Sequence, residues 1–179
     1  MSNYCESYLV EGEFDRIIFK NIGIETVYVA HGKVSVMRRF KEADRGCFIV
    51  DGNEEGFSGI AYRLETSGVK GVKDPPVISV GSKRLIVVGD PDEDFKGSIE
   101  TLLLKALNER DERVNDLLKG LSLTKSRRDK VELLLLTFLK TADDEVFFSV
   151  ERFASKVVEL VGRDKIRETL RALKVICTD

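Results

Sequence analysis

Two carboxylates in the first third of the chain directly follow short apolar runs, and each is followed by a glycine. Glu11 comes after Tyr8-Leu-Val10, and Asp51 comes after Cys47-Phe-Ile-Val50. Because the carboxyl ends of parallel strands meet at one edge of a sheet, where open α/β folds bind ligands, we expect these side chains to lie together. Carboxylate oxygens suit a hard divalent cation such as Mg²⁺, and Mn²⁺ accepts the same ligands. The spacing therefore predicts a magnesium site.

Further oxygen-bearing side chains are expected at the same edge. Asp15 stands four residues after Glu11 and shares its face if the following helix begins early. Asp90 ends the strongest apolar run and opens an acidic stretch that lacks the full ligand pattern of an EF-hand. The alternative for each carboxylate is structural: a solvated loop, an acidic turn, or a favourable charge at the start of a helix. The predicted metal ligands are Glu11, Asp15, Asp51, Asn53, Asp90 and Glu100.

Two basic segments could complement these carboxylates. A later amphipathic segment begins with the basic run Lys125-Ser-Arg-Arg-Asp-Lys130. Within this run, Lys130 is the candidate to contact a phosphate or to stabilise charge beside a metal. The alternative for this run is a solvated helix face. His31-Gly-Lys33 follows another apolar run and is expected to face the same sheet edge, unless it is only a strand-to-helix turn.

Strand and helix patterns alternate over the first part of the chain. Runs rich in apolar and β-branched residues predict strands, and apolar positions at helical spacing predict helices. The predicted strands are residues 7–10, 25–30, 47–50, 76–80 and 83–90, and the predicted helices are 13–22, 33–44, 57–66 and 99–109. This order predicts an α/β fold with a mostly parallel sheet flanked by helices.

Strand signals stop after residue 110. The remaining amphipathic segments predict helices at 111–119, 127–140, 149–161 and 164–174. We therefore predict two parts. Residues 1–110 form an α/β core, and residues 111–179 form a helical C-terminal extension packed on it.

Composition and missing motifs exclude several classes of protein. The net charge is −2 and no apolar run nears the ~20 residues that cross a bilayer, so we predict a cytoplasmic protein without a membrane partner. Three widely spaced cysteines, Cys5, Cys47 and Cys177, predict reduced thiols.

P-loop, GxGxxG, GxSxG and HExxH motifs are absent, which argues against nucleotide-driven motors, dinucleotide dehydrogenases, serine hydrolases and zinc proteases. Because general nucleic-acid binders are usually basic, contact with nucleic acid needs a local basic surface or a bridging metal.

Three segments resemble the Toprim domain, which occurs in topoisomerases, primases, RecR-type recombination proteins and OLD-family nucleases. Val10-Glu-Gly-Glu-Phe-Asp15 is similar to its first motif. Ile49-Val-Asp-Gly-Asn-Glu-Glu-Gly56 is similar to its second motif, with Asn53 where a second aspartate is expected. Gly97-Ser-Ile-Glu-Thr-Leu-Leu103 is similar to a helix of small stand-alone Toprim-like proteins of unassigned function and, more loosely, of OLD-family nucleases.

The resemblance implies a role for each matched residue. Glu11 would hold Mg²⁺ or act in acid–base transfer, Glu100 would be a further ligand, and Lys130 would be the lysine near the site. The implied catalytic residues are thus Glu11 and Lys130, in a protein that hydrolyses or transfers phosphodiester bonds of nucleic acid.

One alternative is a non-catalytic module that binds nucleic acid or a protein partner through a degenerate metal site, which Asn53 and the net acidity favour. Another is a flavodoxin- or receiver-like regulator, and a homo-oligomer is compatible with each.

Overall fold

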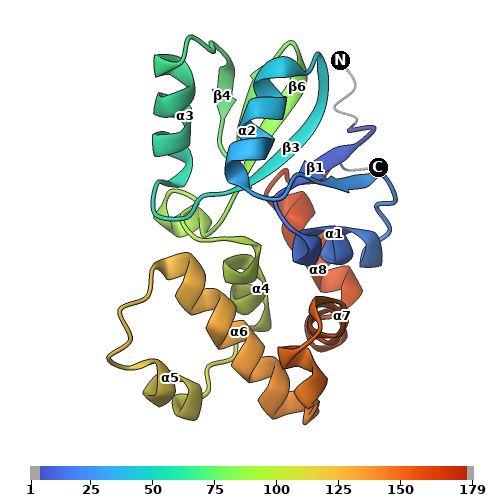
Figure 1. Ribbon diagram of the computed structural model, residues 1–179, viewed down its shortest axis with the longest axis vertical. Helices are drawn as coiled ribbons and strands as arrows, with labels where there is room; N and C mark the ends of the chain where they lie inside the picture. The colour runs from blue at the N-terminus through green and yellow to red at the C-terminus, as the bar shows by residue number, and fades with distance from the viewer. Residues whose placement is uncertain (1–4, 177–179) are drawn as a thin grey trace.

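The strands form one six-stranded mixed sheet, and helices cover both of its faces (Figure 1). The structure is a computed structural model that describes residues 5–176. The strands are β1 (Tyr8–Val10), β2 (Val27–Val29), β3 (Arg45–Asp51), β4 (Val72–Asp74), β5 (Val77–Val80) and β6 (Ser82–Val88). The helices are α1 (Glu13–Asn21), α2 (Lys33–Glu42), α3 (Gly56–Thr66), α4 (Ile99–Leu107), α5 (Glu112–Leu118), α6 (Lys125–Thr141), α7 (Val150–Val161) and α8 (Arg163–Ala172), with 3-10 turns η1 (Pro91–Glu93) and η2 (Asp144–Phe147). The predicted α/β class with a helical C-terminal part is confirmed.

The sheet is mostly parallel, as predicted. Its order is β2-β1-β3-β6-β5-β4, in which β2, β1, β3 and β6 are parallel, while β5 and β4 return as antiparallel neighbours. The sequence pattern did not predict β4, because all three of its residues are exposed and it has no apolar face. At the centre, β3 and β6 pair from Arg45–Ser82 to Asp51–Val88. The end of β3 that carries Asp51 therefore lies between the ends of β1 and β6.

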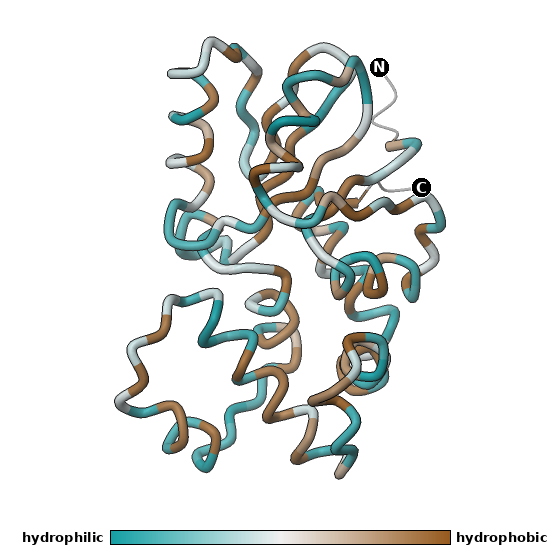
Figure 2. Tube along the Cα trace, viewed as in Figure 1, coloured by the Kyte–Doolittle hydropathy of each residue, from teal (hydrophilic) through white to brown (hydrophobic). Residues whose placement is uncertain are grey.

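Alternate side chains of β3 enter two separate apolar layers, as the pleat of a strand requires. Phe48 and Val50 pack with residues of α2 and α3 on one face of the sheet. Cys47 and Ile49 join a larger cluster on the other face, which contains residues of α1, α4, α7 and α8. Figure 2 shows apolar residues concentrated in the central strands between these layers.

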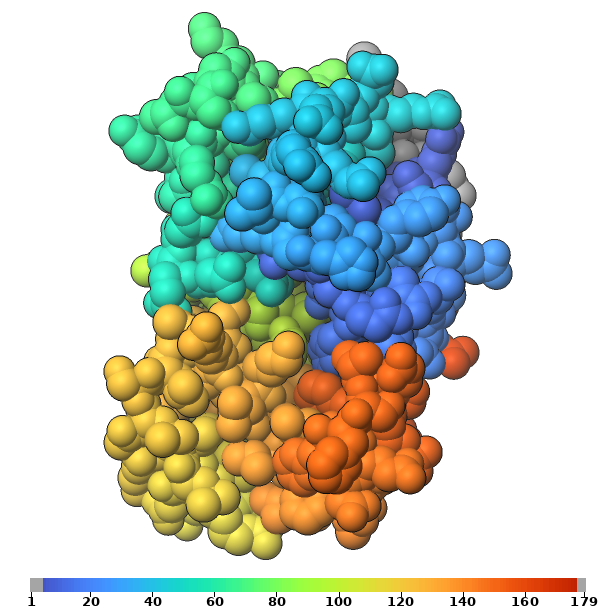
Figure 3. Space-filling model, viewed as in Figure 1, coloured from blue at the N-terminus to red at the C-terminus, as the bar shows by residue number. Residues whose placement is uncertain are grey.

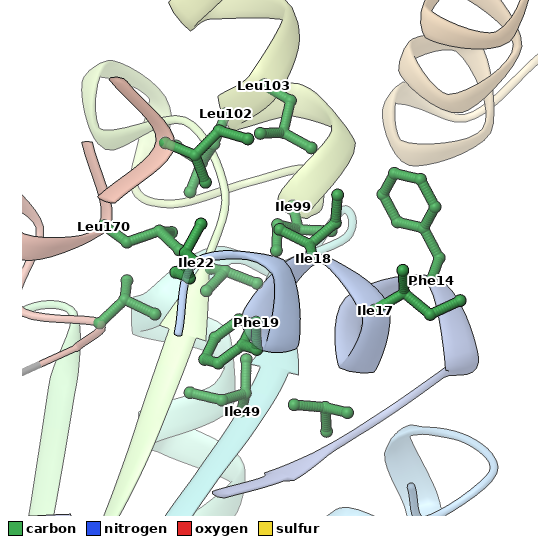
Figure 4. Close-up of a cluster of buried hydrophobic side chains, with 14 of the residues drawn as sticks. Phe14, Ile17, Ile18, Phe19, Ile22, Ile49, Ile99, Leu102, Leu103 and Leu170 are labelled. Atoms are coloured by element: carbon green, nitrogen blue, oxygen red, sulfur yellow. The ribbon is translucent and has the colours of Figure 1, made fainter. Parts of the chain in front are cut away.

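The larger layer joins the two ends of the chain. In Figure 4, Ile18 of α1 lies beside Ile99 of α4, and both belong to the same buried cluster as Leu170 of α8. Phe14 stacks on Phe153 of α7 with 4.9 Å between ring centroids. The C-terminal helices thus share a core with the N-terminal strands, and a domain boundary near residue 110 stays a prediction. Within the described part of the chain, no helix is both long enough and apolar enough to cross a membrane.

Cys5 and Cys47 form a disulfide bond, so the prediction of reduced thiols is wrong for this pair. Cys5 leads into β1, and Cys47 lies in the neighbouring strand β3 as the register partner of Tyr8. This adjacency brings the two Cα atoms to 5.7 Å, a separation that a disulfide spans. Because the cysteines are 42 residues apart, their pairing depends on strand order and not on a local motif. Cys177 lies outside the described residues.

Replacing Cys5 with serine is expected to lower the free energy of unfolding by about 3 kcal/mol, because the bond restricts the unfolded chain. Urea unfolding of the oxidised wild type and of Cys5→Ser measures this difference. The reduced wild type should match the variant. Equal midpoints for the variant and the oxidised wild type would show that the bond does not stabilise the fold.

Candidate functional site

Four carboxyl groups meet at the carboxyl edge of β1 and β3. Glu11 follows β1, and Asp51 ends β3. Asp15 and Glu100 lie in the first turns of α1 and α4. The charge on Glu100 raises the pKa of each of the other three, so all four lie within range of one another's electrostatic fields. Figure 3 shows a hollow between the blue and cyan sheet region and the yellow and orange helices, with the yellow-green chain around the start of α4 at its floor.

Glu11 joins the ends of two strands that have already diverged. The paired register of β1 and β3 covers only Tyr8–Cys47 and Leu9–Phe48. Beyond it, the N–H of Asp51 donates a hydrogen bond of 2.8 Å to the Glu11 carboxylate. Burial raises the pKa of Glu11, although the Asp51 N–H and the charge of Lys33 oppose the rise. The glutamate side chain thus takes the place of a main-chain partner for Asp51.

Asp15 is buried in the first turn of α1. Its carboxylate accepts a hydrogen bond of 3.1 Å from the N–H of Gly12, the residue before the helix, and this contact explains why the helix begins at Glu13. Burial, followed by the charge of Glu100, raises the pKa of Asp15 to about 8. A carboxyl group that holds its proton near neutral pH releases that proton more readily when a cation binds beside it, because a nearby positive charge lowers its pKa.

Asp51 carries an oxygen atom with no partner. Its Oδ1 atom is buried and has no hydrogen bond among the described residues. Burial raises its pKa well above the ordinary value, and the charges of Asp15 and Glu11 add to the rise, while the N–H of Ile99 opposes it. Buried polar atoms are nearly always satisfied, so this unpaired oxygen is available to an ion or a water molecule.

Ser98, the N-cap residue of α4, is a second buried group of this kind. It precedes α4, is 2% exposed, and its Oγ atom also has no hydrogen-bond partner among the described residues. The next residue, Ile99, donates its N–H to Asp51. Two unsatisfied oxygens therefore flank the start of α4. The signal in the sequence is the serine immediately before the helix that carries Glu100.

Glu100 and Lys130 lie together, although they come from different helices. The Lys130 Nζ atom is 3.8 Å from a carboxylate oxygen of Glu100. Glu100 is buried, whereas the Lys130 side chain is 61% exposed, so the lysine can also reach a ligand from solvent. A neighbouring bond from the Thr101 hydroxyl to the Asp129 carboxylate, 2.5 Å long, holds α6 against α4.

Asn53 is placed beside the start of α4 by its main chain. It exchanges two hydrogen bonds with Gly97, of 2.7 and 2.8 Å, and adopts a left-handed conformation with φ of 49°. Gly52 permits this approach, because a Cβ atom there would lie 1.7 Å from the Phe95 carbonyl oxygen. The glycine after Asp51 is thus explained by packing, and Asn53 lies next to the loop that leads to Ser98.

Asp90, in contrast, is engaged by lysines. Its carboxylate contacts the Lys105 Nζ atom at 2.8 Å and the Lys125 Nζ atom at 4.0 Å, and it accepts the N–H of Asp92. Burial opposes ionisation of Asp90, but these hydrogen bonds outweigh it and hold the pKa below its ordinary value. Asp90 therefore ties the end of β6 to α4 and α6, and its oxygens are less available to a metal than those of the four-carboxyl cluster.

The loop after β3 uses its other two carboxylates for structure. Glu54 accepts the N–H of Lys125 at 2.7 Å and so anchors the start of α6. Glu55 accepts hydrogen bonds of 2.8 Å from Lys33 and Arg63. Lys33, predicted to face this edge, contacts two segments of the site, the end of β3 and the loop that follows it.

The four-carboxyl cluster fits a divalent cation in chemistry but not yet in arrangement. All of its donors are hard oxygens, and the unpaired Asp51 Oδ1 atom offers a free position. Within residues 5–176, however, no three acidic, histidine or cysteine side chains are grouped as metal ligands. Glu11 and Asp15 point oxygens toward the N–H groups of Asp51 and Gly12. Binding would require these carboxylates to turn from backbone amides toward a cation.

The fold and site together define an α/β protein with a buried carboxyl cluster at the carboxyl edge of a mostly parallel sheet. No protein-family model, curated protein or solved structure matches the chain.

Proposed function

We propose that this chain is a Toprim-like protein that binds Mg²⁺, or Mn²⁺ in its place, and acts on phosphodiester bonds of nucleic acid. The observation that carries the proposal is the convergence of the Glu11, Asp15 and Glu100 carboxyl groups on Asp51, whose buried Oδ1 atom is unpaired. Glu11, Asp51 and Glu100 would hold the cation, with Asp15 beside them. The metal would supply Lewis acidity toward a phosphate oxygen when bound.

Electrostatics support this proposal. Like charges forced together out of water destabilise a fold, and clusters of this kind with raised pKa values concentrate at functional sites. The pKa of Asp15 rises to about 8, and those of Glu11 and Asp51 also rise. A divalent cation would remove this repulsion.

The chain also offers cations to a phosphate. Lys130 is largely exposed beside Glu100, and Arg127 is exposed one turn earlier on α6. Charged donors of this type bind phosphate oxygens strongly. Lys125 is less available, since it contacts Asp90 and Glu93. The start of α6 thus supplies the local basic surface that a protein of net charge −2 needs in order to hold nucleic acid.

A second candidate function is a module that binds nucleic acid or a protein partner without catalysis. Two observations favour it: no three side chains of the described residues are already grouped as metal ligands, and a neutral amide, Asn53, stands in the second motif. Under this alternative the carboxyl cluster is what remains of a metal site that no longer binds a cation. Metal binding separates the two candidates.

Calorimetric titration with Mg²⁺ and Mn²⁺ is the first test. We expect the wild type to bind with a dissociation constant between about 1 μM and 1 mM, and Asp51→Asn to bind at least about tenfold more weakly. Asp90→Asn should change the affinity by no more than about twofold, because lysines already engage its oxygens. No binding to the wild type would reject the catalytic proposal and favour the binding module.

A further inference from the structure

Lys33 is a largely buried cation at the edge of the carboxyl cluster. It begins α2 directly after the turn from β2, and its side chain is 15% exposed. Its Nζ atom donates a hydrogen bond of 2.9 Å to the main-chain carbonyl of Asp51 and one of 2.8 Å to the Glu55 carboxylate. The lysine therefore joins α2 to the end of β3 and to the loop that follows it.

Lys33 holds one of the two peptide groups that flank the Asp51 Cα atom, and Glu11 holds the other. The N–H of Asp51 donates to Glu11 at 2.8 Å, and the carbonyl of Asp51 accepts from Lys33 at 2.9 Å. These two groups lie on either side of the Asp51 Cα atom, so together they set both backbone torsions of the residue. The direction of its Cα–Cβ bond, which carries the carboxylate with the unpaired Oδ1 atom, follows from them.

Charge and position predict opposite effects of removing Lys33. Its positive charge alone would repel a divalent cation, so its loss would strengthen metal binding. That charge is largely offset, however, by the Glu55 carboxylate 2.8 Å away. The hydrogen bond to the Asp51 carbonyl has no such substitute, and partners that orient a metal ligand typically contribute about 10- to 100-fold to affinity. Losing the hydrogen bond to Asp51 should therefore weaken metal binding by more than losing the positive charge strengthens it.

We propose that Lys33 is a positioning residue that fixes the main chain of Asp51 and thereby orients its carboxylate for a divalent cation. This inference rests on the proposed metal site. It adds, to a site assigned from carboxylates, a lysine that contacts a proposed metal ligand only through the main chain. It also accounts for the Lys33–Glu55–Arg63 chain of ion pairs, which holds the ammonium group in place.

The test compares Lys33→Met with Arg63→Met, which removes the other cation on Glu55 and leaves Asp51 untouched. Mn²⁺ affinity is measured by calorimetry, and hydrogen exchange of the Asp51 amide by NMR. We expect Lys33→Met to weaken binding and to accelerate Asp51 exchange, each by about tenfold or more, and Arg63→Met to change each by no more than about twofold. Lys33→Arg, which keeps a donor for both acceptors, should recover most of the affinity.

Two results would overturn the inference: tighter Mn²⁺ binding by Lys33→Met than by the wild type, or affinity and Asp51 exchange equal to those of Arg63→Met. If Lys33→Met does not fold, the shorter, uncharged Lys33→Gln makes the same comparison. A wild type that binds no Mn²⁺ would reject the proposed function. The exchange of the Asp51 amide would still show whether Lys33 positions that residue.

Discussion

Mn²⁺-dependent cleavage of a phosphodiester should fall about 10³-fold in Glu11→Gln, the scale of loss when one group that organises charge is removed from an active site. Glutamine keeps the volume of the side chain, and its amide oxygen can still accept the N–H of Asp51, which Glu11 accepts at 2.8 Å. The variant therefore loses a negative charge and a metal ligand while the junction of β1 and β3 persists. An activated diester and single-stranded DNA and RNA oligonucleotides are suitable substrates.

Glu13→Gln is the matched control for this prediction. Glu13 lies two residues away, on the exposed side of α1, where it pairs with Arg16 and does not join the carboxyl cluster. Its activity should stay within about twofold of the wild type, since exposed pairs contribute little. Equal activities of Glu11→Gln and the wild type would remove Glu11 from the mechanism. Nucleic-acid binding by a wild type that does not cleave would favour the non-catalytic module.

The elements that position the site could be predicted because their signals are local. The apolar runs before Glu11 and Asp51 predict buried strands, and a strand that ends in a carboxylate beside glycine predicts where that carboxylate lies. The structure brings both residues to one edge, together with Asp15 and Glu100. The chemistry expected there stays a prediction.

Contacts between distant segments could not be predicted from these patterns. Asp90 follows a strand just as Asp51 does, yet Lys105 and Lys125 engage it, and only the packing of α4 and α6 brings those lysines near. The disulfide likewise depends on the adjacency of β1 and β3, to which the spacing of Cys5 and Cys47 gives no clue. Strand ends indicate which residues reach an edge, whereas helix packing decides which of them remain free.

β4 could not be predicted for a different reason: the strand has no buried face. Its residues are all exposed, so the alternation that marks a half-buried strand is missing, and only pairing with β5 defines it. The exposed hairpin lies at the far end of the sheet order from β1 and β2. Its omission therefore left the predicted site unchanged.

The metal-free protein should become less stable as the pH rises from 4 to 8, and Asp15→Asn should remove much of that loss. The folded-state pKa of Asp15 is raised from 3.8 to about 8, first by burial and then by Glu100. The folded protein thus holds a proton that the unfolded chain releases, so the stabilisation is complete below pH 4 and is lost as the pH approaches 8. Between pH 4 and 8, a shift of this size corresponds to at most roughly 5 kcal/mol, and we expect about half because the carboxyl groups share their protons.

Thermal and urea unfolding from pH 4 to 8, with a chelator present, measure this effect. At pH 8 the stability of Asp15→Asn should exceed that of the wild type by about 2 kcal/mol. At pH 4 the two should nearly agree, because Asp15 is then protonated in the folded state and only partly ionised in the unfolded chain, and asparagine can still accept the Gly12 N–H. Mn²⁺ should raise the stability of the wild type at pH 8 more than that of the variant, since binding to the folded state alone stabilises it. A wild type whose stability does not change between pH 5 and 8 would contradict the raised pKa. A gain on adding Mn²⁺ that is equal in both proteins would place Asp15 outside the metal site.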